Sequence, residues 1–189
     1  MQARAKQRHH GPALLILDLI SEYRFEDWRS ILAAAQRVAP RIARLRHRAR
    51  AAGVPVIYVN DAGPHWESDR TRFVERARAS KARGSAVVRC IEPAADDYFI
   101  FKPRHSGFYA TPLAEILSNL AVKRLILTGL TSHQCVLFTA VDAYLRNHEL
   151  IVPPDCIGAP SAIQTRHALF VLRESLNAST PQSPHVRFA

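Results

Sequence analysis

The sequence has 189 residues, of which 48% are hydrophobic, a length and composition typical of one soluble globular domain and not of a disordered or membrane-embedded chain. Its formal net charge of +10 raises nucleic-acid binding as a hypothesis, but the arginines alternate with apolar residues at helical spacing, which is typical of the solvated faces of helices. The three cysteines are widely separated and form no Cys-x-x-Cys pair, which excludes a secreted disulfide framework and favours a reducing, cytoplasmic compartment.

The first 12 residues form a basic tail in front of a short apolar run. Asp18 interrupts this run and no small-residue cleavage site follows, so we expect neither a signal peptide nor a membrane span. The run ALLILDL at 13–19 predicts a strand buried on both faces. A helical pattern at 31–52 then ends at Gly53, a favourable C-terminal cap, and the apolar run VPVIYV predicts the second strand.

The rest of the chain continues the alternation of helix and strand patterns. We expect a charged helix at 71–83 closed by Gly84, a strand at 98–102, a helix from Thr111, a strand at 122–129, a helix at 133–147, a strand at 148–153 and a last helix at 161–176. This alternation predicts an α/β fold: a single-domain three-layer sandwich over 13–176, with a mainly parallel sheet flanked by helices. The polar, proline-containing segment 177–189 predicts a loosely ordered tail.

Three reactive side chains follow the ends of predicted strands, where sites gather in parallel α/β folds. Asp18 ends the first strand, Lys102 ends YFIFK, and Cys135 follows RLILTG within the stretch TGLTSHQCV. Each alone has an ordinary interpretation, as a cap, a surface lysine and a core cysteine. Together they supply a thiol nucleophile, an ammonium group that favours its thiolate and a carboxylate that accepts its proton, while the helix start offers N–H groups to an oxyanion.

Five segments in order resemble the isochorismatase-like cysteine hydrolase superfamily, which contains nicotinamidases and hydrolases of small amides and carbamoyl compounds. They are LLILDLI, VIYVND, DYFIFKPRHSGFYATPL, RLILTGLTSHQCVLFTAVDAYLRNHEL and IVPPDCIGA. The resemblance covers about 13–172 and implies that Asp18, Lys102 and Cys135 are a catalytic triad. It further implies a cis peptide between Leu130 and Thr131, which would direct the Thr131 N–H, with that of Cys135, at an oxyanion. A homo-oligomer is expected on the same ground.

Departures from the family pattern narrow the expected substrate. Nicotinamidases resemble one another in an Asp-x-His metal motif after the second strand, whereas this chain has DAGPH at 61–65, so we expect no catalytic metal and no nicotinamidase activity. The sequence leaves open whether Asp61 or His65 contributes to a metal site or a pocket. Family members that hydrolyse isochorismate usually lack the cysteine, so Cys135 favours amide chemistry. We therefore expect a cofactor-free hydrolase of non-peptide carbon–nitrogen bonds, which cleaves a small amide or carbamoyl compound through a thioester.

Four further residues are candidates for lining the substrate pocket: Trp66, His105, Phe108 and Tyr109. Two other functions remain open at this point. One is hydrolysis of a vinyl ether, for which replacing Cys135 by alanine would leave turnover largely intact. The other is a basic nucleic-acid-binding protein on the same fold, although we do not expect nucleic acid or membrane as a partner. The sequence does not name the substrate.

Overall fold

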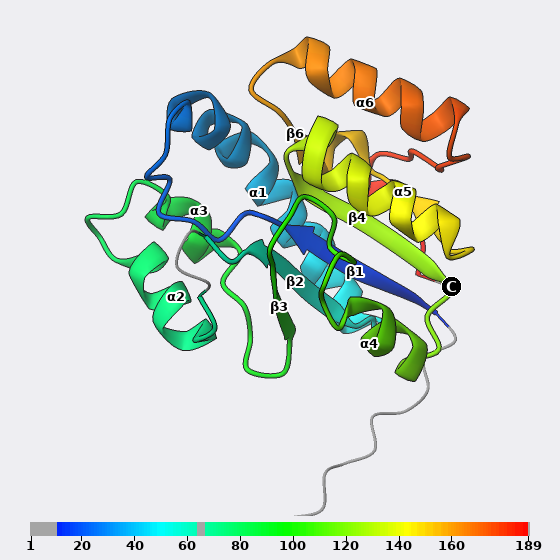
Figure 1. Ribbon diagram of the computed structural model, residues 1–189, viewed down its shortest axis with the longest axis horizontal. Helices are drawn as coiled ribbons and strands as arrows, with labels where there is room; N and C mark the ends of the chain where they lie inside the picture. The colour runs from blue at the N-terminus through cyan, green and yellow to red at the C-terminus, as the bar shows by residue number, and fades with distance from the viewer. Residues whose placement is uncertain (1–10, 64–66, 189) are drawn as a thin grey trace, which may run out of the picture.

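The sheet at the centre of the molecule is parallel throughout. The computed structural model describes residues 11–63 and 67–188. Its strands are β1 (Pro12–Leu17), β2 (Val56–Asp61), β3 (Tyr98–Lys102), β4 (Arg124–Leu130), β5 (Glu149–Ile151) and β6 (Ile157–Gly158). They lie in the order β3-β2-β1-β4-β5, and β6 pairs with β4. The first strand is therefore central, and the carboxyl ends of all strands meet at one edge of the sheet (Figure 1).

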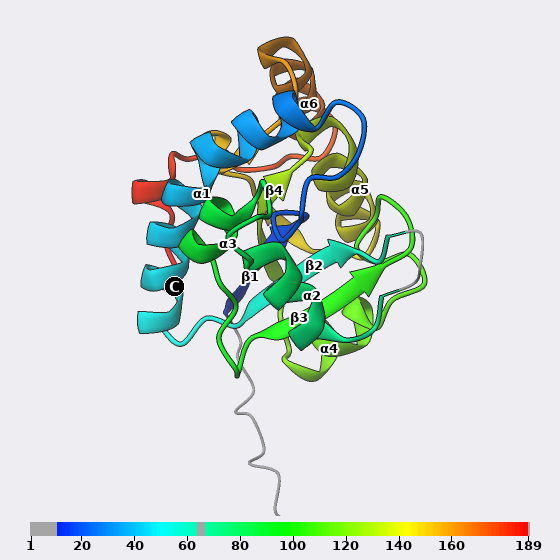
Figure 2. The same cartoon turned by 90° about the vertical axis from the view of Figure 1, so that its left-hand side faces the viewer.

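Helices cover both faces of this sheet and make the predicted three layers. They are α1 (Trp28–Ala51), α2 (Arg70–Arg78), α3 (Ser85–Cys90), α4 (Leu113–Asn119), α5 (Leu137–Leu145) and α6 (Ala162–Glu174). Side chains of α1 and α3 belong to one apolar cluster, and those of α4, α5 and α6 belong to the other. Figure 2 shows α1 and α5 on opposite sides of the central strands. The predicted α/β sandwich is confirmed.

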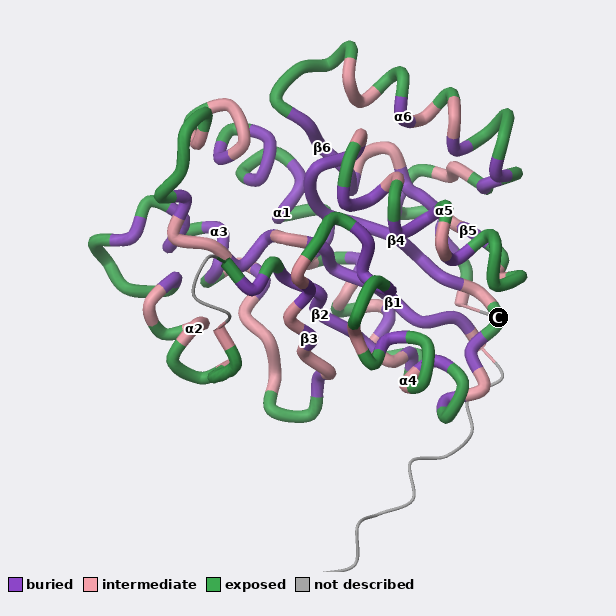
Figure 3. The backbone as a smooth tube through the Cα atoms, viewed as in Figure 1, coloured by how far each residue is buried: buried purple, intermediate pink, exposed green. Residues whose placement is uncertain are grey.

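The apolar run at the start of the chain explains why β1 is central. Leu14 and Ile16 belong to the cluster under α1, and Leu15 and Leu17 to the cluster under α5, and all four side chains are fully buried. Successive side chains of a strand point to opposite faces, so only a continuous apolar run suits a strand covered on both sides. Figure 3 shows the central strands β1 and β4 buried and the outer turns of the helices exposed.

The charged segment after β2 differs from its prediction as one helix at 71–83. Here α2 ends at Arg78, and Gly84 is the N-cap of α3 instead of the end of the earlier helix. A Cβ atom on Gly84 would lie 2.3 Å from the Ser21 carbonyl oxygen, so this position packs directly on the connection between β1 and α1. This close approach joins residues that are far apart in the sequence, so no local pattern records it. In the described residues, no helix has the length and apolar character needed to cross a membrane.

The C-terminal segment, predicted to be loosely ordered, makes specific contacts. Ser179 bridges to Ile151 beside β5, and the Ser183 hydroxyl donates to the Asp155 carboxylate over 2.6 Å. The Arg48 guanidinium of α1 donates to two carbonyls of this segment, and Val186 is buried against α1. Its polar composition is therefore explained by hydrogen bonds to α1 and to Asp155, partners that lie far away in the sequence. Residues 1–10 lie outside the described part of the chain.

Candidate active site

The ends of β1 and β4 approach unusually closely, and this brings the segments after them together. Gly129 has φ 110°, and a Cβ atom there would lie only 2.1 Å from the Leu17 carbonyl oxygen. A side chain cannot be accommodated at such a distance, and positive φ favours glycine in any case. Gly129 thus allows the residue after β1, Asp18, to lie beside the segment that leads to Cys135.

Asp18, which follows the carboxyl end of β1, is held by two hydrogen bonds to the neighbouring strand. Its own N–H donates to the Val59 carbonyl over 3.0 Å, and its Oδ1 accepts the N–H of Asp61 over 2.7 Å. Both partners are on β2, so the neighbouring strand orients the carboxylate. Asp18 itself has φ 51°, in the left-handed region that L-residues seldom adopt. The second carboxylate oxygen, Oδ2, faces Lys102.

Lys102 connects three parts of the site. It ends β3, which lies two strands away from β1, and its fully buried side chain extends past the end of β2. Its Nζ lies 2.8 Å from Asp18 Oδ2 and donates to Cys135 Sγ over 3.5 Å. A shorter side chain on β3 would not bridge the intervening strand. Lys102 is therefore a buried cation shared by a carboxylate and a thiol, and not a surface lysine.

Cys135 lies in a turn of π-helix, Ser132–Val136, that precedes α5, where the sequence predicted regular helix from His133. The residue is 9% exposed. Its Sγ contacts Lys102 Nζ on one side and His105 Nδ1, at 3.8 Å, on the other. Single π-helical turns frequently occur at functional sites. The thiol thus reaches the carboxyl edge of the sheet with a cation and an imidazole beside it.

Burial controls the protonation of these groups. It raises the pKa of the Asp18 carboxyl, against the opposing charge of Lys102. Burial also raises the pKa of the Cys135 thiol, and the negative charge of Asp18 raises this pKa further. The positive charge of Lys102 acts in the opposite direction and lowers it. For Lys102, burial disfavours the charge, but the charges of Asp18 and Cys135 outweigh it and raise the pKa. The resting site therefore holds a neutral thiol beside an ammonium group, which differs from the lowered thiol pKa that the sequence predicted.

The peptide bond between Leu130 and Thr131 is cis, at the position that the family resemblance implied. The two residues link β4 to the π-helical turn, and the Thr131 carbonyl accepts the N–H groups of Gln134 and Val136. Thr131 is buried next to the turn that carries Cys135. The role of its N–H toward an oxyanion stays a prediction.

The predicted pocket residues fall into different environments. His105 lies beside the thiol, and Tyr109 is 59% exposed. Phe108 is instead buried in the core, where its ring contacts the Arg146 guanidinium at 4.8 Å, beyond the end of α5 that is remote from Cys135. This placement excludes it from the immediate surroundings of the thiol. Trp66 and His65 lie outside the described residues.

Two residues that interact with His105, the neighbour of the thiol, were not predicted as site residues. The ring of Phe138, the second residue of α5, lies 5.5 Å from that of His105. His133 is half-buried, and its pKa is lowered first by burial and then by the charge of His105. The sequence could have indicated His133 as a site residue, because it lies two residues before Cys135 and therefore on the same turn.

Metal binding has no support within the described residues, because no group of three or more His, Cys, Asp or Glu side chains there could hold an ion. The Asp61 carboxylate accepts the N–H of Gly63 instead, which is typical of a turn. His65, the other residue that the sequence left open for a metal site, lies outside the described residues.

Fold and site together define a parallel α/β protein with a thiol, a lysine and a carboxylate at the carboxyl edge of its sheet. The family model for the isochorismatase domain matches residues 12–181. The chain is 35% identical over 166 residues to the isochorismatase family protein YaaI of Bacillus subtilis, covering 88% of this chain and 91% of that one. The chain therefore belongs to the isochorismatase family and is a hydrolase of that family.

Other relatives are characterised by the reactions in their names. The ureidoacrylate amidohydrolase RutB of Methylorubrum extorquens is 33% identical over 155 residues, which span 70% of this chain and 62% of that protein. N-carbamoylsarcosine amidase of Thermoplasma acidophilum superposes with a TM-score of 0.70 at 26% identity, covering 93% of this chain and 98% of that one. A nicotinamidase of Staphylococcus aureus, with a TM-score of 0.68 at 21% identity over 93% of this chain and 98% of that one, shares the fold.

Proposed function

We propose that this protein is a cysteine amidohydrolase that cleaves a small amide or carbamoyl compound through a thioester formed on Cys135. The observation that carries the proposal is the position of Lys102 Nζ, 2.8 Å from the Asp18 carboxylate and 3.5 Å from the Cys135 thiol. A buried cation in contact with both groups stabilises the negative charge wherever the proton lies. Asp18, Lys102 and Cys135 are accordingly assigned as the catalytic triad.

The first half-reaction begins from the neutral thiol. As Sγ attacks the carbonyl carbon of the substrate, Asp18 takes the thiol proton, and burial, which raises the pKa of this carboxyl, makes it a stronger base than an exposed aspartate. Lys102 stabilises the developing thiolate. The N–H groups of Thr131 and Cys135 receive the oxyanion. The carbon–nitrogen bond then breaks, the leaving nitrogen takes the proton from Asp18, and the acyl group stays on Sγ as a thioester.

The second half-reaction restores the thiol. Asp18, a carboxylate again, removes a proton from a water molecule that attacks the thioester carbon. The carbon–sulfur bond breaks, and Asp18 returns the proton to Sγ. Every proton is thus transferred by Asp18, and Lys102 stays charged throughout because its neighbours raise its pKa. The mechanism needs a reduced cysteine, in keeping with a cytoplasmic compartment.

The substrate class is inferred from two relatives. RutB is named for ureidoacrylate and the Thermoplasma enzyme for N-carbamoylsarcosine, both of which carry a carbamoyl nitrogen. We therefore place carbamoyl and ureido compounds before nicotinamide as substrates of this chain. A homo-oligomer remains part of the proposal.

The direct test is ammonia release from a panel of ureido compounds, carbamoyl amino acids, simple primary amides and nicotinamide. The wild-type protein is compared with Cys135→Ala and with Cys90→Ala, a matched control at a half-buried cysteine of α3 that takes no part in the site. We expect release by the wild type and the control only, together with an acyl adduct on Cys135 detected by mass spectrometry after rapid quenching. Undiminished turnover by Cys135→Ala would refute the thioester and favour the vinyl-ether alternative.

A further inference from the structure

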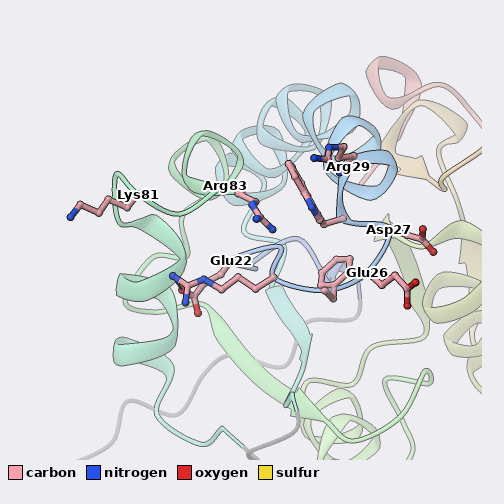
Figure 4. A pocket seen from close by; sticks show the side chains of 9 residues that line it. Glu22, Glu26, Asp27, Arg29, Lys81 and Arg83 are labelled. Carbon is pink, nitrogen blue, oxygen red and sulfur yellow. Dashed lines mark ion pairs between the residues drawn. The ribbon is translucent and has the colours of Figure 1, made fainter.

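A hollow separate from the triad lies on the carboxyl side of the sheet and is not lined by Asp18, Lys102 or Cys135. Its volume is about 780 Å³, within the range of roughly 300 to 1,000 Å³ typical of ligand sites. Its walls come from the connection between β1 and α1, from the first two residues of α1 and from the connection between α2 and α3. The lining residues are Glu22, Arg24, Phe25, Glu26, Asp27, Trp28, Arg29, Lys81 and Arg83 (Figure 4).

The hollow combines aromatic rings with guanidinium groups. The Cζ atom of Arg83 lies 4.1 Å from the centre of the Trp28 ring, and that of Arg29 lies 4.7 Å from it. Phe25 is 43% exposed and adds a second ring to the wall. A planar ring placed here meets an apolar surface, and an anionic group on that ring meets arginines, whose planar fork suits carboxylates and phosphates.

The acidic residues of the wall oppose an anion less than their number suggests. Glu22 is paired with Arg24 at 3.4 Å and with Arg76, which is outside the hollow, at 3.6 Å. Figure 4 shows the carboxylates of Glu26 and Asp27 on the other side of the hollow from Arg83, directed away from it. Arg83 and Arg29, which both lie against the Trp28 ring, are thus the cations closest to the aromatic wall.

Arg83 is also fixed in place before any ligand arrives. Its guanidinium donates to the Tyr23 carbonyl over 3.1 Å, and the next residue, Gly84, packs so closely on Ser21 and Tyr23 that no side chain fits between them. A group that is already ordered loses little entropy on binding. The surrounding charge favours anions as well, because residues 22–92 carry fifteen Lys and Arg against eight Asp and Glu, whereas residues 93–189 carry eight against seven.

We propose that this hollow binds a planar aromatic anion, with its ring against Trp28 and Phe25 and its carboxylate or phosphate on Arg83 and Arg29. The anion is either the far end of the substrate or a separate effector. Tyr23 connects the two sites in the structure, since its carbonyl accepts from Arg83 while its ring is buried near Asp18, whose charge adds to burial in raising the pKa of the phenol.

Calorimetric titration of the full-length protein tests the ligand class with four probes. Phenyl phosphate and benzoate carry both features, benzyl alcohol has the ring without the charge, and inorganic phosphate has the charge without the ring. We expect saturable binding of the first two and at least about tenfold weaker binding of the others, because each then lacks one of two contacts. Absence of saturable binding, or equal binding of all four, would overturn the proposal.

Substitutions locate the site. Arg83→Gln is expected to weaken phenyl phosphate binding by about tenfold or more, whereas Arg89→Gln, at an exposed arginine on α3 outside the hollow, should leave it unchanged. Since Arg83 also bonds to Tyr23, Trp28→Leu and Arg29→Gln provide independent tests if Arg83→Gln does not fold. Unchanged affinity in the folded variants would exclude the hollow as the binding site.

The kinetics separate the two sources of the anion, and this step alone rests on the proposed amidohydrolase activity. If the substrate reaches the hollow, Arg83→Gln raises KM with little change in kcat, and phenyl phosphate inhibits competitively. If the ligand is an effector, phenyl phosphate binds without competing. Binding by Cys135→Ala protein shows that the hollow is independent of turnover, so a failed amidase assay and a failed binding assay are distinguishable.

Discussion

Replacing Lys102 by methionine provides the sharpest test of the buried cation. The change keeps most of the chain length but removes the charge 2.8 Å from Asp18 and 3.5 Å from Cys135. Loss of one preorganised electrostatic contact to a transition state typically costs about 100-fold to 1,000-fold in kcat. Because Lys102 contacts both the base and the nucleophile, we expect a loss in kcat/KM of at least about 1,000-fold, measured by ammonia release.

The same substitution should destabilise the protein in a pH-dependent way. Removing one partner of a buried ion pair costs roughly 3 to 5 kcal/mol, and we expect the lower end, about 3 kcal/mol at pH 8, because the Asp18 side chain stays 16% exposed. Without Lys102 the folded-state pKa of Asp18, already raised by burial, rises further above its unfolded value. The protonated carboxyl is then favoured in the folded state, so stability is retained at low pH and is lost as the pH rises through that pKa.

Urea unfolding at pH 5 and pH 8 measures this dependence. The deficit relative to wild type should be smaller at pH 5, and the double variant Asp18→Asn with Lys102→Met should show no increase in deficit between the two pH values. Lys123→Met, at an exposed lysine before β4, serves as the matched control and should change neither activity nor stability. Activity within threefold of wild type, or a deficit that is equal at both pH values, would refute the assignment of Lys102.

Three further predictions concern other parts of the molecule. Asp18→Asn removes a charge that raises the pKa of the Cys135 thiol. Iodoacetamide should therefore label Cys135 faster than in wild type at pH 8, although turnover is lost. Slower labelling would contradict the electrostatic argument. Gly129→Ala places a Cβ atom 2.1 Å from the Leu17 carbonyl oxygen and should lower the free energy of unfolding by about 2 to 4 kcal/mol. The control Gly11→Ala, where the nearest atom is 3.7 Å away, should change this free energy by less than about 0.5 kcal/mol. Equal urea midpoints for the two variants would contradict the prediction. The expected homo-oligomer predicts a mass in light scattering that is a multiple of 21.2 kDa, with Leu145→Glu on the exposed face of α5 as a probe of the contact; a monomeric wild type would refute it.

The elements predicted best from the sequence are those with a strong local pattern. The apolar run at 13–19 predicted a strand covered on both sides, and β1 forms at Pro12–Leu17. Gly53, with φ 72°, follows the end of α1 at the position that the helical pattern indicated. The helix boundaries around 79–84 and 132–136 were predicted less well. At 132–136 the π-helical turn of Cys135 replaces regular helix, and at Gly84 the chain packs on the distant β1–α1 connection, a contact that local propensity does not contain.

The sequence by itself determined the α/β class, the parallel sheet and the order of an acid, a lysine and a cysteine at strand ends, because hydrophobic periodicity and strand-end position are local properties of the chain. Only the tertiary structure decided how these groups meet. The strand order places Lys102 two strands from Asp18, and its long buried side chain then contacts residues 84 positions before it and 33 after it. The same packing set His105 beside the thiol and Phe108 in the core, although the two are three residues apart. Contacts between distant segments depend on which strands pair and which faces are covered, and neighbouring residues carry no signal of either.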